Sequence, residues 1–221
     1  MSIFSNSNIS IEKTKNSYKL IFKNKSLFPQ YHEYLSNSFP NTSNKKQNED
    51  TQELLFNCSN IQILNNKNKH ELSYNDFEVF FIWFKGMLEN LEKDNNSLLL
   101  LNMNDFVLIT LDTNRNVLLF INSDKFLPLS DNKIELLTPF SKKNIFLSPE
   151  LYKLENIPSK INKKSIFYSI SVFITHCLNN IDNIEDLDFN KQLESINNTK
   201  LFFAMIRCLK INPNNRYYLF I

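Results

Sequence analysis

Glycine is almost absent from this chain, because Gly86 is the only one in 221 residues. A phosphate-binding loop of the glycine-rich type needs several glycines so that the backbone can approach the ligand closely. The sequence therefore excludes nucleotide-binding mechanisms that depend on such a loop. Its turns must be made with Asn, Asp, Ser and Pro, and Asn is the best substitute where φ is positive.

Cysteine, net charge and long apolar runs are also scarce. The three cysteines, Cys58, Cys177 and Cys208, form no CxxC pair, which argues against a disulfide framework and fits a reducing compartment. The formal net charge of +2 indicates neither a nucleic acid nor a membrane as partner. No run reaches the ~18 apolar residues of a spanning helix, and no secretory signal is recognisable at the start. We expect a soluble intracellular protein, in the cytoplasm or nucleus.

Apolar and aromatic residues are abundant, and their spacing predicts an α+β protein. The chain is 42% hydrophobic and contains 20 Phe, enough for a folded core. Strand patterns cluster before residue 65 and helical patterns after residue 70, which divides the chain into residues 1–64 and 65–221. The expected elements are a strand over 17–24, helices over 74–93, 163–180 and 198–210, a hairpin over 104–122 and an irregular stretch over 123–147.

Five segments, in order, resemble the protein-kinase fold from about residue 50 to the end. They are "HELSYNDFEVFFIWFKGMLENLEKDN", the hairpin over 105–121, "LSPELY", "KSIFYSISVFITHCL" and "IRCLKINPNNRYYLFI". "LSPELY" is similar to the A-P-E motif of kinases, and the last segment is similar to their closing CL-DP-RP pattern. The resemblance implies an α+β, kinase-like fold with a small, shortened, sheet-containing N-lobe and a larger, mainly helical C-lobe. It also implies a structural ion pair between Glu150 and Arg216.

The kinase chemistry is missing from the positions where the resemblance places it. Phosphoryl transfer needs a base and magnesium-binding groups. Apolar or neutral residues stand at the catalytic-loop and magnesium-motif positions, namely Leu99, Leu100, Leu101, Phe106, Ile121, Asn122 and Ser123. Leucine neither accepts a proton nor binds Mg²⁺. We expect no catalytic, cofactor-binding or metal-binding residues, and the histidines are scattered without metal-ligand spacing.

The resulting hypothesis is a catalytically inactive pseudokinase, not an enzyme, that acts as a scaffold or as an allosteric subunit of a complex. Its partner is expected to be a protein, bound at the C-lobe and at the 123–147 segment with its "PFSKKN" stretch. One alternative is a divergent active kinase that uses Lys19 or Lys23, Asp105 and Asp124. Another is a helical protein-interaction module unrelated to kinases.

Overall fold

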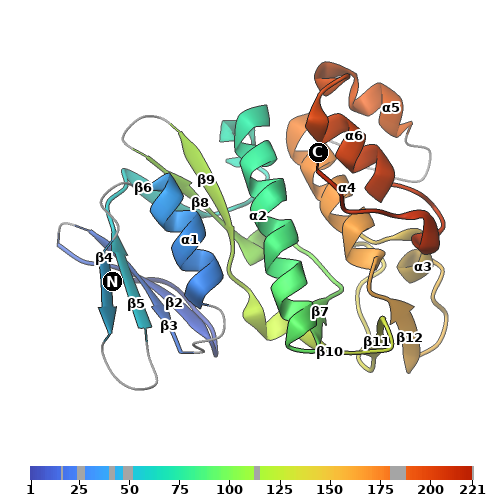
Figure 1. Ribbon diagram of the computed structural model, residues 1–221, viewed down its shortest axis with the longest axis horizontal. Helices are drawn as coiled ribbons and strands as arrows, with labels where there is room; N and C mark the ends of the chain where they lie inside the picture. The colour runs from blue at the N-terminus through green and yellow to red at the C-terminus, as the bar shows by residue number, and fades with distance from the viewer. Residues whose placement is uncertain are drawn as a thin grey trace. The chain divides into compact units, whose positions relative to one another are not determined.

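The computed structural model divides the chain into two compact units (Figure 1). It describes residues 1–15, 17–23, 28–39, 43–46, 52–111, 115–179 and 188–220. The first unit contains Met1–Asn65 and Asn104–Asp124, and the second contains Asn66–Met103 and Lys125–Ile221. The chain therefore passes between the units three times, whereas the order of strand and helix patterns predicts a single boundary after residue 64.

A five-stranded antiparallel sheet forms the larger sheet of the first unit, in the order β1-β2-β3-β5-β4. Its strands are β1 Ser2–Ser5, β2 Ile9–Lys13, β3 Tyr18–Phe22, β4 Ser43–Lys46 and β5 Gln52–Phe56. Tyr18, Leu20 and Phe22 alternate inward along β3, as expected for a strand with one buried face. The helix α1, Phe28–Ser38, packs on this sheet through Tyr31, whose ring centroid lies 5.3 Å from that of Phe22.

A three-stranded antiparallel sheet, β6-β8-β9, completes the first unit. Its strands are β6 Asn60–Ile63, β8 Phe106–Thr110 and β9 Asn116–Phe120. The expected hairpin is confirmed, since β8 and β9 pair with Val107 opposite Leu119. Tyr31 Oη donates to the carbonyl oxygen of Phe120 at 2.7 Å, so α1 is bonded to β9.

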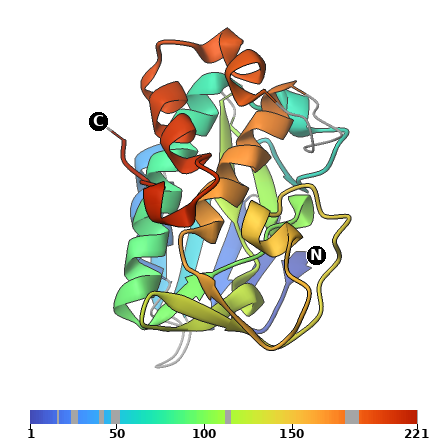
Figure 2. The same cartoon turned by 90° about the vertical axis from the view of Figure 1, so that its right-hand side faces the viewer.

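Helices make up much of the second unit (Figure 2). They are α2 Tyr74–Lys93, α3 Pro149–Tyr152, α4 Ser165–Asn179, α5 Phe189–Gln192 and α6 Lys200–Cys208. The expected helix over 74–93 is confirmed, and a capping box begins it. Ser73 Oγ accepts from the backbone N–H of Asp76 at 3.3 Å, and the Asp76 carboxylate accepts from the backbone N–H of Ser73 at 2.8 Å.

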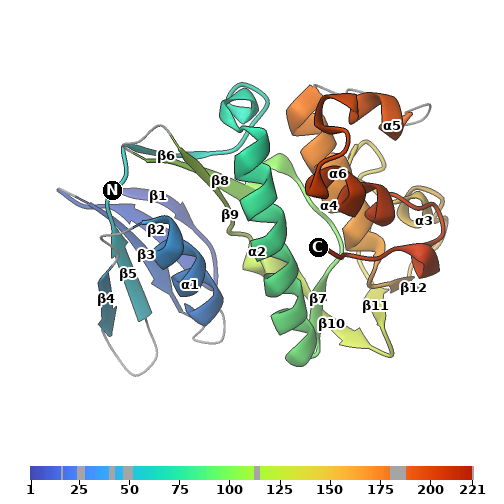
Figure 3. The same ribbon diagram turned by 45° about the horizontal axis from the view of Figure 1, so that its top comes forward.

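The second unit also contains a four-stranded antiparallel sheet in the order β12-β11-β10-β7 (Figure 3). Its strands are β7 Asn96–Leu98, β10 Phe126–Ser130, β11 Lys133–Leu136 and β12 Ser159–Asn162. The segment over 123–147 is thus not irregular, because β10 and β11 form a hairpin within it. Asp131 and Asn132 make its two-residue turn at φ values of 52° and 60°. Asp and Asn take these positive φ values where many hairpins use glycine.

The kinase-like architecture expected from the sequence is wrong. The described chain forms three antiparallel sheets, and one of them lies in the second unit, which is therefore not a mainly helical lobe. The first unit is not a shortened lobe either, since it holds both the five-stranded and the three-stranded sheet. The α+β class is right. The motifs matched short segments, whereas the architecture depends on strand pairing between distant segments.

Gly86 lies in α2 at a place where an added Cβ would meet no atom within 4 Å. Glycine within a helix is less favourable than alanine by about 1 kcal/mol. We expect Gly86→Ala to raise the free energy of unfolding by about that amount and the melting temperature by about 2–4 °C. Gly86→Thr should stabilise less, because threonine is a poorer helix former. A fall in stability for both variants in urea unfolding would show that this face of α2 does not tolerate a side chain.

Candidate functional site

The three leucines at the expected catalytic-loop positions lie in the hydrophobic core of the second unit. Leu99 is fully buried in a cluster with residues of the four-stranded sheet, of α3 and of the segment before α3, namely Ile134, Leu136, Leu147, Leu151 and Ile161. Leu101 is also buried, and Leu100 packs partly buried against the same cluster. These side chains fill space, which explains their apolar character without reference to a lost catalytic site.

The four remaining positions belong to the first unit. Phe106 and Phe120 face each other across β8 and β9, with ring centroids 5.4 Å apart. Ile121 is buried, and Asn122 Nδ2 donates to Asp105 Oδ1 at 2.8 Å. Ser123 begins a 3₁₀ turn over Ser123–Lys125 and is buried. The seven positions are thus divided between two units, and each has a packing or hydrogen-bonding role.

The charged residues of the alternative catalytic set also have structural contacts in the first unit. Lys19 Nζ lies 2.6 Å from Glu53 Oε1, an ion pair between β3 and β5. Lys23 Nζ donates to the carbonyl oxygen of Asn6 at 2.9 Å. Asp105 accepts from Asn122, and Asp124 accepts from the hydroxyl of Ser7.

The structure brings Glu150 and Arg216 together within the second unit. Arg216 Nη1 and Nη2 lie 2.5 and 2.7 Å from the two carboxylate oxygens of Glu150, a bidentate pair. Arg216 is 0% exposed, whereas the Glu150 side chain is 21% exposed. The guanidinium also stacks over the ring of Tyr168 at 5.1 Å.

Every N–H group of the Arg216 side chain has an acceptor. Besides the two bonds to Glu150, Nε donates to the carbonyl oxygen of Lys210 at 2.6 Å. Nη1 donates to the carbonyl oxygen of Lys164 at 3.3 Å, and Nη2 to that of Ile211 at 2.8 Å. A guanidinium has five N–H groups, so these five bonds leave no donor for a ligand. Arg216 is therefore a structural residue that fixes the C-terminal segment to α3 and α4.

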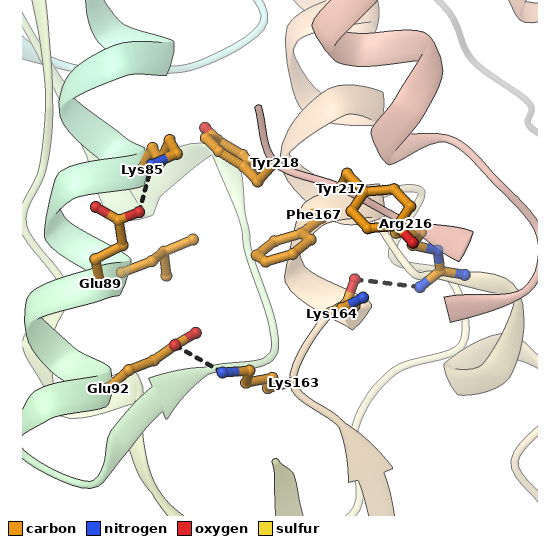
Figure 4. Close-up of a pocket in the computed structure, with 10 residues that line it drawn as sticks. Lys85, Glu89, Glu92, Lys163, Lys164, Phe167, Arg216, Tyr217 and Tyr218 are labelled. Atoms are coloured by element: carbon orange, nitrogen blue, oxygen red, sulfur yellow. Dashed lines mark hydrogen bonds and ion pairs between the residues drawn. The ribbon is translucent and has the colours of Figure 1, made fainter. Parts of the chain in front are cut away.

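A groove with a volume of about 230 Å³ lies next to Arg216 in the second unit (Figure 4). It is lined by α2, the start of α4 and the C-terminal segment, through Lys85, Leu88, Glu89, Glu92, Lys163, Lys164, Phe167, Arg216, Tyr217 and Tyr218. Leu88, Phe167 and the two tyrosines supply apolar and aromatic surface, and most of the other side chains are charged. We refer to this set as the α2–α4 groove.

Ion pairs hold the rim of the α2–α4 groove. Lys163 Nζ lies 2.6 Å from Glu92 Oε2, so the turn that precedes α4 is tied to α2. Lys85 forms an i,i+4 pair with Glu89 on α2 itself (Figure 4). Since both carboxylates on the rim already bind lysines, the charges on the α2 side largely neutralise each other.

The C-terminal segment from Arg216 to Phe220 is extended and alternates between buried and exposed side chains. Tyr218 points inward, stacks on Phe81 with ring centroids 4.2 Å apart, and donates from Oη to the Phe81 carbonyl oxygen at 3.0 Å. Burial raises the pKa of Tyr218 well above its usual value, so its hydroxyl remains a donor at any physiological pH. Tyr217 and Leu219 point outward, and Tyr217 is 60% exposed. In Figures 2 and 3 this red segment runs beside α2.

Sequence reasoning missed the α2–α4 groove, although it singled out Arg216. Residues 85–92, 163–167 and 216–218 are far apart in the chain, so no local pattern joins them. The alternation in "RYYLF" was the available signal, because a period of two indicates an extended segment with one buried face.

The "PFSKKN" stretch, expected to be a docking surface, is bonded to its own unit. Lys142 Nζ donates to the carbonyl oxygens of Leu151 at 2.9 Å and Leu154 at 2.6 Å. Asn144 Nδ2 donates to the carbonyl oxygen of Leu101 at 2.8 Å. These bonds fix the stretch to α3 and the preceding core.

A buried polar cluster that the sequence did not suggest also lies in the second unit. Lys69 Nζ is 2.8 Å from His176 Nε2 and 3.3 Å from the His176 carbonyl oxygen. His176 Nε2 is also 3.1 Å from Asn66 Oδ1. The cluster ties the 3₁₀ turn η2, Lys69–Glu71, to α4.

No protein-family model matches the chain, and no curated protein matches it. Within the described part of the chain, no helix is both long and apolar enough to cross a membrane. None of the three cysteines forms a disulfide bond. Among the described residues, no three His, Cys, Asp or Glu side chains are grouped so that they could hold a metal ion.

Proposed function

We propose that this chain is a non-catalytic protein-binding module, acting as a scaffold or as an allosteric subunit, and that it binds its partner through the α2–α4 groove. The observation that carries the proposal is the groove itself, with an aromatic floor, an ionic rim and an outward-pointing Tyr217. An apolar centre that contains tyrosine, inside a polar rim, is typical of protein interfaces.

The size of the α2–α4 groove favours a protein side chain over a cofactor. Pockets for drug-sized ligands and cofactors measure roughly 300–1,000 Å³. The groove has about 230 Å³, which suits one large anchoring side chain. Leu219, which directly follows the lining residue Tyr218 in the chain, is also exposed and adds apolar surface that a larger partner would cover.

We also propose an intracellular location, in the cytoplasm or nucleus. Cys177 and Cys208 are buried, and burial raises the pKa of each thiol to about 12. Such thiols behave as small apolar core residues rather than as partners for disulfide formation.

Site-specific photocrosslinking tests the proposed function. A benzophenone amino acid is placed at Tyr217 and, as a matched control, at Leu137, which is 64% exposed in the same unit. In extract of the native cells, we expect position 217 to form a discrete crosslink to a specific protein and position 137 to form none. The same crosslinks at both positions, or none at 217, would contradict binding at the groove.

A further inference from the structure

We infer that the α2–α4 groove binds a short acidic peptide segment, in which a large apolar or aromatic side chain is adjacent to an Asp or Glu. The inference rests on the proposed function and names the chemistry of the partner. It follows from which of the four cations around the groove are paired with a carboxylate of the protein.

Three of the four cations that line the α2–α4 groove already have carboxylate partners. Arg216 is bonded to Glu150 and has no donor left, Lys163 pairs with Glu92, and Lys85 pairs with Glu89. An incoming carboxylate at any of these positions would have to displace an existing one.

Lys164 is the exception. Its Nζ lies 3.3 Å from the carbonyl oxygen of Asn214 and 4.8 Å from the ring centroid of Tyr217, and it pairs with no carboxylate among the described residues. An exposed ammonium with only a long hydrogen bond and an aromatic face retains capacity for an anion. The α2–α4 groove therefore presents one cation beside an aromatic floor.

The positions of Lys164 and Tyr217 specify how the ligand groups must be arranged. Because the Lys164 ammonium lies over the Tyr217 ring, a side chain packed against that ring brings its neighbouring residue close to Lys164. Phe167 and Leu88 extend the same apolar floor toward α2. An aromatic residue next to Asp or Glu satisfies both requirements, whereas an aromatic residue next to Lys would place two ammonium groups together.

Selection from a random twelve-residue peptide library displayed on phage tests this inference. Wild-type protein should enrich peptides with an aromatic or large aliphatic residue next to Asp or Glu. Lys164→Glu should reverse the preference, so that Lys or Arg replaces the acidic residue. Lys143→Glu, an exposed lysine in the same unit, is the matched control and should select the same peptides as the wild type.

Fluorescence polarisation, with the peptide that the wild-type protein enriches most, measures how much each substitution weakens peptide binding. We expect Lys164→Glu to weaken binding about tenfold or more, which corresponds to about 1.4 kcal/mol, and Lys143→Glu to change it less than about twofold. Thermal melting of each variant checks that it is folded.

A failure of the acidic-peptide inference can be distinguished from a failure of the proposed function. Peptides that bind with no charge preference, or with the same preference in Lys164→Glu, would overturn the acidic class while leaving groove binding intact. Enriched peptides that bind Tyr217→Ser as well as the wild type, or no enrichment at all, would overturn the proposed function too. Concentration-dependent dimerisation that Tyr217→Ser abolishes would identify a second copy as the occupant and would also overturn the inference.

Discussion

Arg216→Met is expected to destabilise the protein by about 3–5 kcal/mol, because it leaves a partly buried carboxylate without its partner. The substitution removes all five hydrogen bonds of the guanidinium, two to Glu150 and three to backbone carbonyl oxygens. Each kcal/mol corresponds to about 2–4 °C in a chain of this size, so the melting temperature should fall by about 10 °C. Urea unfolding followed by circular dichroism measures the change.

Two comparisons separate the contribution of the ion pair to stability from that of side-chain packing. Arg207→Met removes a half-buried arginine whose hydrogen bond to the Leu219 carbonyl oxygen is long at 3.5 Å, and it should cost much less stability. The double variant Arg216→Met with Glu150→Met should be more stable than Arg216→Met alone, because it no longer buries a lone charge. Equal stability of Arg216→Met and Arg207→Met would refute the structural role assigned to Arg216.

Leu99→Ala is expected to cost about 2–5 kcal/mol, the range for removing a fully buried leucine from a packed core. Leu99 is 0% exposed among the apolar side chains of the four-stranded sheet and α3. Leu99→Asp should be worse, since it would bury a charge without a partner. The measurement is again the free energy of unfolding in urea.

Leu100→Ala is the matched control for Leu99, because the neighbouring leucine is only partly buried against the same cluster. It should cost less than half as much. A stable, folded Leu99→Asp variant would show that the position is not a core position, and the interpretation of the leucines as packing residues would fail.

Local signals predicted several elements well. Helix α2 was predictable because Ser73 and Asp76 form its cap and apolar residues repeat at helical spacing behind them. The β8–β9 hairpin was predictable from two runs of strand-forming residues around a polar turn. The use of Asn and Asp at positive φ followed from the scarcity of glycine.

Strands that form only because of the strands they pair with were not predicted from local patterns. Strand β4, Ser43–Lys46, has no apolar residue to indicate a strand, and it forms because β5 pairs with it. Strands β10 and β11 contain Pro128 and few β-branched residues, but pairing with β7 and β12 holds them in a sheet. The kinase-like interpretation failed for the same reason, because its motifs are local and the sheets are not.

The candidate site was predictable only in part. The motifs indicated that Glu150 and Arg216 belong together, and they lie in contact. The α2–α4 groove beside them depends on Lys164 and Tyr217, which are separated by more than fifty residues. No local spacing relates an ammonium group to an aromatic ring at that separation.

The three passages of the chain between the units limit how the protein can be divided. A fragment that ends at residue 65 would lack β8 and β9, so β6 would lose the strand that it pairs with. The complementary fragment, residues 66–221, would contain β8 and β9 but would lack β6, the strand with which β8 pairs. We therefore expect neither fragment to fold independently. The unfolding of one unit is coupled to the other through three covalent connections rather than one.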